Sequence, residues 1–153
     1  MRYEYIEPLV ATTKKVLSNV LRTDVSSGAI GLVKADDVQG DVSIVIKVKG
    51  DSEGCIMVNM ETVTAQRVCA VMNGSDGAQA APLEMDAIAE LSNMLAGNAT
   101  SALNDLGYDF MVYPPVVVAP ADIPTRTEGV ELFRITLATP CGEMSMHVAL
   151  RTE

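Results

Sequence analysis

Two side chains that could take part in chemistry, a carboxylate and a carboxamide, stand three residues apart at Glu90 and Asn93. They belong to a predicted amphipathic helix over residues 86–106, in which polar or small residues recur on one narrow stripe at about 100° per residue. This stripe consists of Asp86, Glu90, Asn93, Gly97 and Thr100. The apolar residues on the opposite side are expected to face the core, and they are Ile88, Leu91, Leu95, Ala99, Ala102 and Leu106.

The composition of this polar stripe is unusual for a face that serves only solubility. Such a face is normally filled by strong helix formers, whereas asparagine and glycine are poor ones. Glycine inside a helix costs about 1 kcal/mol relative to alanine, so Gly97 indicates close approach by another surface. An ordinary solvated face is the competing interpretation, because Glu and Asn three residues apart are common on helices.

The side chains available exclude several familiar kinds of catalysis. His147 is the only histidine, and no serine stands in a G-x-S-x-G motif, so a nucleophile with its base is not indicated. No G-x-x-x-x-G-K-[ST] loop is present to hold a phosphate. Asp86 and Glu90 lie a single turn apart, which does not suit the opposed acid and base of a glycosidase. What remains is a carboxylate that can hold a cation and an amide that can position a water. Together they could complete a reaction whose electrophile and metal come from a partner, as positioning residues do in phosphoryl transfer.

Composition and charge narrow the class of protein. The 153 residues suit one domain, and 48% of them are hydrophobic and 20% charged, as is typical of globular proteins. The net charge of −9 argues against nucleic acid and anionic membranes as partners. Apolar runs are too short to span a bilayer, and the first ten residues do not resemble a secretory signal, so we expect a cytoplasmic protein.

The lone histidine predicts no metal bound by this chain. Reduced core packing is predicted for the three dispersed cysteines, Cys55, Cys69 and Cys141.

Hydrophobic periodicity predicts two halves of similar layout within a single domain over residues 1–153. The predicted helices cover residues 7–21, 61–72 and 86–106, and the predicted strands cover 29–33, 42–48, 54–58, 110–119, 130–139 and 143–151. Residues 6–59 and 83–151 each contain a helix followed by three antiparallel strands, so we interpret them as pseudo-repeats. The expected fold is therefore α+β, a six-stranded, mainly antiparallel sheet with long helices packed on it. Exposed edge strands of such a sheet could pair two copies of the chain into a homodimer.

The predicted helix and its surroundings resemble a known family. Residues 87–99, AIAELSNMLAGNA, resemble the signature helix of the CheC and CheX group of chemotaxis phosphatases. In that pattern an Asp or Ser is followed by Glu four residues later, by Asn three residues after that, and by a proline further downstream. Asp86, Glu90 and Asn93 match this pattern, and Pro115 stands in the place of the proline.

The resemblance implies a function and a role for each of these residues. The family hydrolyses the aspartyl phosphate of CheY-like receiver proteins in chemotaxis or related two-component signalling. The phosphorylated receiver supplies the phosphoaspartate, a lysine and Mg²⁺, so no cofactor would be bound by this chain. Glu90 would pair with that lysine, and Asn93 would orient the attacking water. The remaining residues expected to contact the receiver are Asp86, Met94, Gly97 and Pro115.

This chain differs from the CheC-type members of the group in the number of sites per chain. CheC-type members carry a second Glu-x-x-Asn motif on the first helix, but Val16 stands where that glutamate would be, three residues before Asn19. The resemblance therefore implies the CheX arrangement, with one site per chain and a homodimer formed through the sheet. Two alternatives stay open: a module that binds or sequesters phosphorylated receiver without hydrolysing it, and a structural dimer that has no receiver partner.

Overall fold

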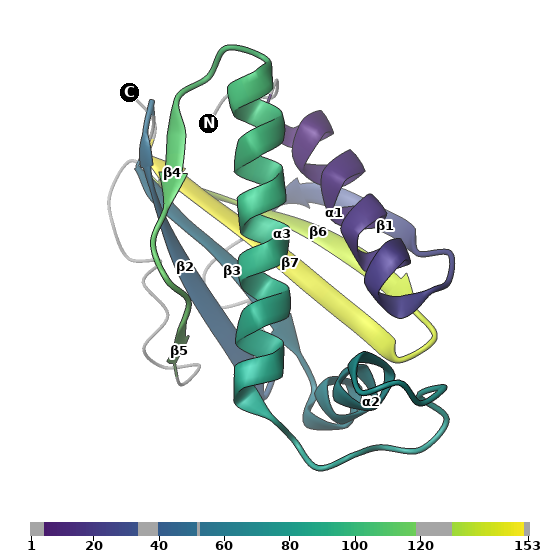
Figure 1. Ribbon diagram of the computed structural model, residues 1–153. Coiled ribbons are helices and arrows are strands. Elements are labelled where there is room, and N and C mark those ends of the chain that lie inside the picture. Colours follow the sequence, from purple (N-terminus) through teal and green to yellow (C-terminus); the bar gives the residue numbers. More distant parts are fainter. Residues whose placement is uncertain (1–4, 34–39, 52, 119–129, 152–153) are drawn as a thin grey trace.

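An antiparallel sheet forms the centre of the fold, and the helices lie against it (Figure 1). The computed structural model describes residues 5–33, 40–51, 53–118 and 130–151. The helices of this part of the chain are α1 (Ile6–Leu21), α2 (Thr62–Met72) and α3 (Met85–Asp105). The strands are β1 (Ser26–Leu32), β2 (Val42–Gly50), β3 (Gly54–Met60), β4 (Phe110–Val112), β5 (Val116–Val118), β6 (Val130–Thr139) and β7 (Gly142–Arg151).

The strand order is β1-β6-β7-β3-β2-β4, with β5 also paired to β2, and each of these pairings is antiparallel. The predicted α+β class with an antiparallel sheet is thus confirmed. The order is symmetric about the central β3–β7 pair, because the strands that follow α1 and those that follow α3 occupy equivalent places. Such symmetry is what an internal repeat over residues 6–59 and 83–151 would produce, and the repeat itself stays a prediction.

The predicted strand over residues 110–119 is two short strands instead of one. Pro114 and Pro115 stand between β4 and β5, and proline has no N–H with which to continue a ladder of hydrogen bonds. Among the described residues the sheet therefore has seven strands, where six were predicted. The last residue of the predicted strand, Ala119, lies outside the described residues. The first predicted strand, 29–33, begins three residues earlier, at Ser26.

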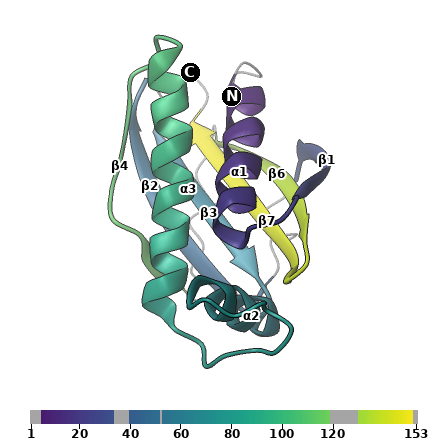
Figure 2. The same ribbon diagram turned by 45° about the vertical axis from the view of Figure 1, so that its right-hand side comes forward.

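The helices α1 and α3 pack side by side on one face of the sheet (Figures 1 and 2). Residues of β2 alternate in direction, so Ile44, Ile46 and Val48 join the core beneath these helices, while Val45 belongs to a smaller cluster on the opposite face. The three cysteines are buried, as their apolar contexts predict. Among the described residues, no helix combines the length and the apolar character that crossing a membrane requires.

The C-terminal end of α3 is fixed to the start of β4. Gly107, at φ +98°, donates its N–H to Asn104 O at 2.9 Å, and Tyr108 donates to Leu103 O at 3.0 Å, which is a Schellman motif. The Asn104 side chain then pairs with the backbone of Phe110, donating to its carbonyl at 3.1 Å and accepting from its N–H at 2.8 Å. Leu106 was expected in the core but is 63% exposed, because the helix has already ended at Asp105.

Candidate functional site

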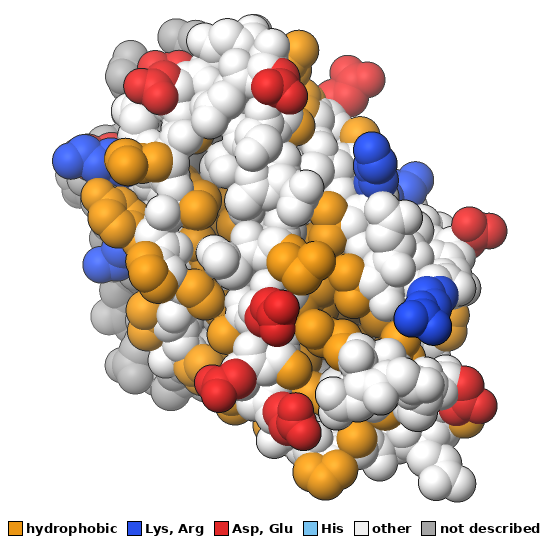
Figure 3. Space-filling view, in the orientation of Figure 1, with side chains coloured by type: hydrophobic (Ala, Val, Ile, Leu, Met, Phe, Trp, Pro, Cys, Tyr) orange, Lys and Arg blue, Asp and Glu red, His pale blue; other side chains and the backbone are white. Residues whose placement is uncertain are grey.

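The polar stripe of α3 lies on the side of the helix that faces away from the sheet. Asp86, Glu90 and Asn93 are all exposed, and Gly97 is partly exposed. Figure 3 shows acidic side chains along the N-terminal half of this helix, in the lower part of the view. Within the described part of the chain, neither the Glu90 carboxylate nor the Asn93 carboxamide has a hydrogen-bond partner. Both groups are therefore free to bind a group from outside the chain.

Thr100 does not belong to this stripe, contrary to the prediction. Its side chain is 6% exposed, and its hydroxyl donates to the carbonyl oxygens of Ala96 at 3.0 Å and Gly97 at 2.9 Å. Three residues of helix turn the side chain about 60° away from Gly97, which is enough to bring it to the packed side. The presented stripe therefore ends at Gly97.

Gly97 has no packing reason among the residues that the structure describes. A Cβ atom placed on it would meet nothing within 4 Å, in contrast to Gly50 and Gly142, where a Cβ would clash. The helix thus carries a residue that costs about 1 kcal/mol relative to alanine and gains no intramolecular contact in return. Gly97 therefore leaves open space on this side of α3.

The other unusual helix residues of α3 have local explanations. The Asn98 side chain donates to the carbonyl of Met94 at 2.7 Å, one turn earlier in the same helix. Asn104 holds β4, as described above. Neither amide is available in the way that the Asn93 amide is, so the number of asparagines in α3 alone does not identify the site.

Pro115 stands between β4 and β5, in the segment that returns from the end of α3. Asn104 and Phe110 are joined by hydrogen bonds, and from that point β4–β5 runs back along α3 in both views of the ribbon (Figures 1 and 2). Five residues of extended chain, from Phe110 to Pro115, cover about 16 Å. Eleven residues of helix, from Asn104 back to Asn93, rise by a similar distance of about 16 Å. From these ideal lengths Pro115, 22 positions after Asn93 in the sequence, is expected near the same level along α3.

An apolar strip accompanies the polar stripe. Large hydrophobic side chains that are between 38% and 60% exposed are found on α3 and along β4–β5, and they are Met94, Met111, Tyr113, Val116 and Val117. Figure 3 shows hydrophobic atoms gathered over β4 and β5, beside α3. We call these five residues the apolar strip. A patch of exposed apolar side chains bordered by charged ones is typical of a protein–protein interface.

The groups on this surface are suited to positioning and to charge complementarity. The described residues include no group of three or more His, Cys, Asp or Glu side chains that could hold a metal ion. The exposed carboxylates of Asp86 and Glu90 give the stripe a negative charge, which suits a partner that presents a cation. The Asn93 amide can both donate and accept hydrogen bonds and can therefore orient a water.

The first helix offers no second site of this kind. Val16, at the position where CheC-type members have a glutamate, is 8% exposed and belongs to the core. A carboxylate there would be buried among apolar side chains instead of facing solvent. The single site per chain stays a prediction.

His147 belongs to the opposite face of the sheet, in a polar cluster that the sequence did not reveal. Its Nδ1 lies 2.7 Å from Asn59 Oδ1, and Asn59 Nδ2 donates to Ser43 Oγ at 2.8 Å. Burial, reinforced by the positive charge of Arg134, lowers the pKa of His147 to about 4. The alternation of Glu143, Ser145 and His147 along β7 was the available signal, since side chains two residues apart share a face.

Comparison with known proteins identifies the family. Residues 42–137 match the family of the chemotaxis phosphatase CheX. The CheY-P phosphatase CheX of Thermotoga maritima is 29% identical over 128 residues, which are 83% of each chain.

Solved structures agree with this match. The chemotaxis protein CheX from Desulfovibrio desulfuricans superposes with a TM-score of 0.81 at 28% identity, over 97% of this chain and 99% of that one. The chain from the CheX–CheY–BeF3–Mg²⁺ complex of Borrelia burgdorferi has the same fold, with a TM-score of 0.78 at 24% identity over 98% and 99% of the two chains. With its sheet, its presented helix and a match over more than half of its length, the chain belongs to the CheX family of chemotaxis phosphatases.

Proposed function

We propose that this chain hydrolyses the aspartyl phosphate of a CheY-like receiver protein, with Glu90 and Asn93 entering the receiver's active site. The observation that carries the proposal is the exposed, unpartnered Asn93 amide, one helical turn from Glu90 and beside the open surface at Gly97. The name of the Thermotoga relative and the Borrelia complex with CheY support the choice of partner.

Each partner contributes a different part of the reaction. The receiver supplies the phosphoaspartate, a lysine and Mg²⁺, so the chain described here needs no metal of its own. Glu90 pairs with the receiver's lysine and fixes the position of the helix. Asn93 holds a water in line with the phosphorus, and the water oxygen bonds to phosphorus as the bond to the aspartyl oxygen breaks. The aspartate leaves as a carboxylate, and the proton of the water passes to the released phosphate or to solvent. Phosphoryl transfer depends mainly on such positioning and on charge.

The surroundings of the two residues make the rest of the contact. Asp86 adds a second negative charge toward the receiver's cations. Gly97 allows the receiver's backbone to approach α3, and Met94 and Pro115 add apolar surface to the contact. The apolar strip continues this contact along β4–β5.

Replacement of Asn93 tests the catalytic role. We expect Asn93→Ala to slow the decay of phosphorylated receiver by about 100-fold, which is the scale on which misplaced reactants lose rate. Asn98→Ala is the matched control, because it also removes an exposed amide from α3. The hydrogen bond that this amide makes stays within the helix. It should retain nearly the wild-type rate. Equal decay rates for the Asn93→Ala variant and the wild type would refute the proposal.

A binding assay separates hydrolysis from sequestration. Receiver carrying beryllofluoride and Mg²⁺, which imitate the phosphorylated state, should bind the wild type and Asn93→Ala with similar affinity. Glu90→Gln should weaken this complex, because it removes the charge that faces the lysine. A wild-type protein that binds the receiver tightly but leaves the rate of phosphate loss unchanged would be a sequestering module instead of an enzyme.

We also propose that two copies of the chain associate through the sheet. The strand β1 lies at one end of the strand order, and it pairs with β6 on one side only among the described strands. Its exposed residues include Ile30 and Leu32, which are 42% and 59% exposed. An open edge with large apolar side chains is suited to pairing with a second strand. This edge lies at the opposite end of the sheet from β4, so a dimer would leave α3 open to the receiver.

A further inference from the structure

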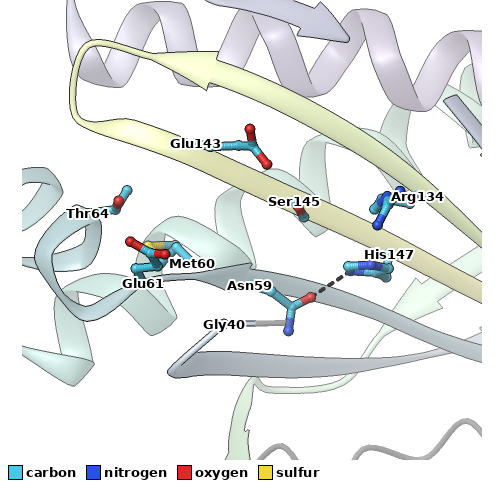
Figure 4. A pocket seen from close by; sticks show the side chains of 9 residues that line it. All are labelled: Gly40, Asn59, Met60, Glu61, Thr64, Arg134, Glu143, Ser145 and His147. Carbon is cyan, nitrogen blue, oxygen red and sulfur yellow. Dashed lines mark hydrogen bonds between the residues drawn. The ribbon is translucent and has the colours of Figure 1, made fainter. Parts of the chain in front are cut away.

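A polar pocket lies on the face of the sheet opposite α3, and it takes no part in the proposed phosphatase reaction. It has a volume of about 300 Å³ and is formed by β3, β6, β7 and the start of α2. Figure 4 shows how its side chains are divided: Glu61, Thr64 and Glu143 lie toward one end, while Arg134 and His147 lie toward the other.

The two ends of the pocket carry opposite charges. Glu61 and Glu143 supply two carboxylates at one end, and Arg134 supplies a guanidinium at the other. None of the three forms an ion pair with another residue in the described ranges. Arg134 is paired with His147 across β6 and β7, and His147 stands four residues after Glu143, so the charged ends are about 13 Å apart along the strand at the level of the backbone.

The middle and the floor of the pocket offer hydrogen-bond acceptors. Asn59 donates from its amide nitrogen to Ser43 Oγ, so its oxygen faces His147 and accepts a hydrogen bond from the Nδ1–H of the ring. The neutral ring then leaves Nε2 as an acceptor, and this atom is buried without a partner among the described residues. Ser145 lies between the two ends and adds a hydroxyl.

We propose that this pocket binds a dipeptide or a similarly short peptide. The free amino group would lie between Glu61 and Glu143, the carboxylate would pair with Arg134, and the amide N–H between them would meet the acceptors of Ser145 and His147. Two residues of extended chain span about 7 Å, which leaves room for the glutamate and arginine side chains to reach inward. A water takes about 30 Å³, so the pocket has space for roughly ten non-hydrogen atoms, close to the size of glycylglycine.

Titration of the full chain with glycylglycine, followed by calorimetry and by ¹⁵N NMR of the histidine ring, tests this assignment. Because His147 is the only histidine, its Nε2 signal is unambiguous. We expect saturable binding with a shift of that signal. Arg134→Met removes the guanidinium but keeps an unbranched side chain, and Glu143→Gln removes the charge without changing the shape. Each should weaken binding at least 10-fold. Two variants at opposite ends keep the test decisive if one of them folds poorly.

Two comparison ligands test the role of the amide and the role of the ammonium group separately. The compound 5-aminopentanoate has the same chain length and the same charged ends but no amide, and it should bind several-fold more weakly. N-acetylglycine lacks the ammonium group and should bind at least 10-fold more weakly. Absence of saturable binding at 10 mM glycylglycine, or binding that neither variant weakens, would overturn the proposal. Equal affinity for 5-aminopentanoate would overturn the role of the amide.

Because the phosphatase surface lies on the other face, the Arg134→Met and Glu143→Gln variants should leave the decay of phosphorylated receiver unchanged. Either proposal can therefore fail without the other.

Discussion

The glycine at position 97 allows stability and function to be separated by a single methyl group. In Gly97→Ala the new Cβ meets nothing within 4 Å, so no strain opposes the better helix propensity of alanine. We therefore expect the free energy of unfolding to rise by about 1 kcal/mol. For a chain of this length, that change raises Tm by about 2–4 °C.

The same methyl group should impair the action on the receiver. If the receiver's surface packs against Gly97, an added methyl group overpacks the contact, which typically costs about 1–3 kcal/mol. Because about 1.4 kcal/mol corresponds to a tenfold change in affinity, we expect binding of the receiver to weaken between roughly 5-fold and 100-fold. The measurements are thermal unfolding of the free chain and the decay of phosphorylated receiver over a range of receiver concentrations.

A second glycine provides the control. Gly31 lies in β1, and a Cβ there also meets nothing within 4 Å. Gly31→Ala should stabilise the chain by up to about 1 kcal/mol, because glycine weakens a strand interior, while the decay of phosphorylated receiver stays at the wild-type rate. If Gly97→Ala is stabilised and fully active, the open space at Gly97 does not serve the partner. If it is destabilised, the helix itself needs the glycine.

Three further predictions concern the fold, the pH dependence and the assembly. Asn104→Ala removes both hydrogen bonds to Phe110 and should lower the free energy of unfolding by about 1–2 kcal/mol in urea titrations; a loss below about 0.3 kcal/mol would contradict the anchoring role. The pKa of His147 is lowered from 6.5 to about 4, so the unfolded chain binds the additional proton between these values. The contribution of His147 to the free energy of unfolding should therefore be fully present above pH 6.5 and fall as the pH drops toward 4, by on the order of 2 kcal/mol at pH 5. His147→Gln should remove this dependence on pH. An identical dependence in both proteins would show that carboxylates cause it. Leu32→Lys, which places a charge on the open edge of β1, should turn a dimer into a monomer in light scattering after size-exclusion chromatography, and an unchanged mass would place the dimer contact elsewhere.

Much of the candidate site could be predicted because it lies on one helix. The positions of Asp86, Glu90, Asn93 and Gly97 depend only on the repeat of the α-helix, and the structure places them on the side that faces solvent, as predicted. The same reasoning was wrong for Thr100. A residue near the border of a helical stripe can face either solvent or the core, and the neighbouring elements that pack against it decide which. It was also wrong for Leu106. The helix ends at Asp105, so the direction of the Leu106 side chain no longer follows the helical repeat.

The sequence by itself determined the class of fold, the faces of β2 and α3 and the residues of the polar stripe, because periodicity is a local property of the chain. Tertiary structure alone decided that β4 and β5 run back along α3, an arrangement that the hydrogen bonds between Asn104 and Phe110 fix at its start. It also decided that Glu61 at the start of α2, Arg134 of β6 and His147 of β7 surround one pocket. Residues distant in the sequence meet only where the register of strands and the packing of helices place them, and neither can be read from the spacing within one element.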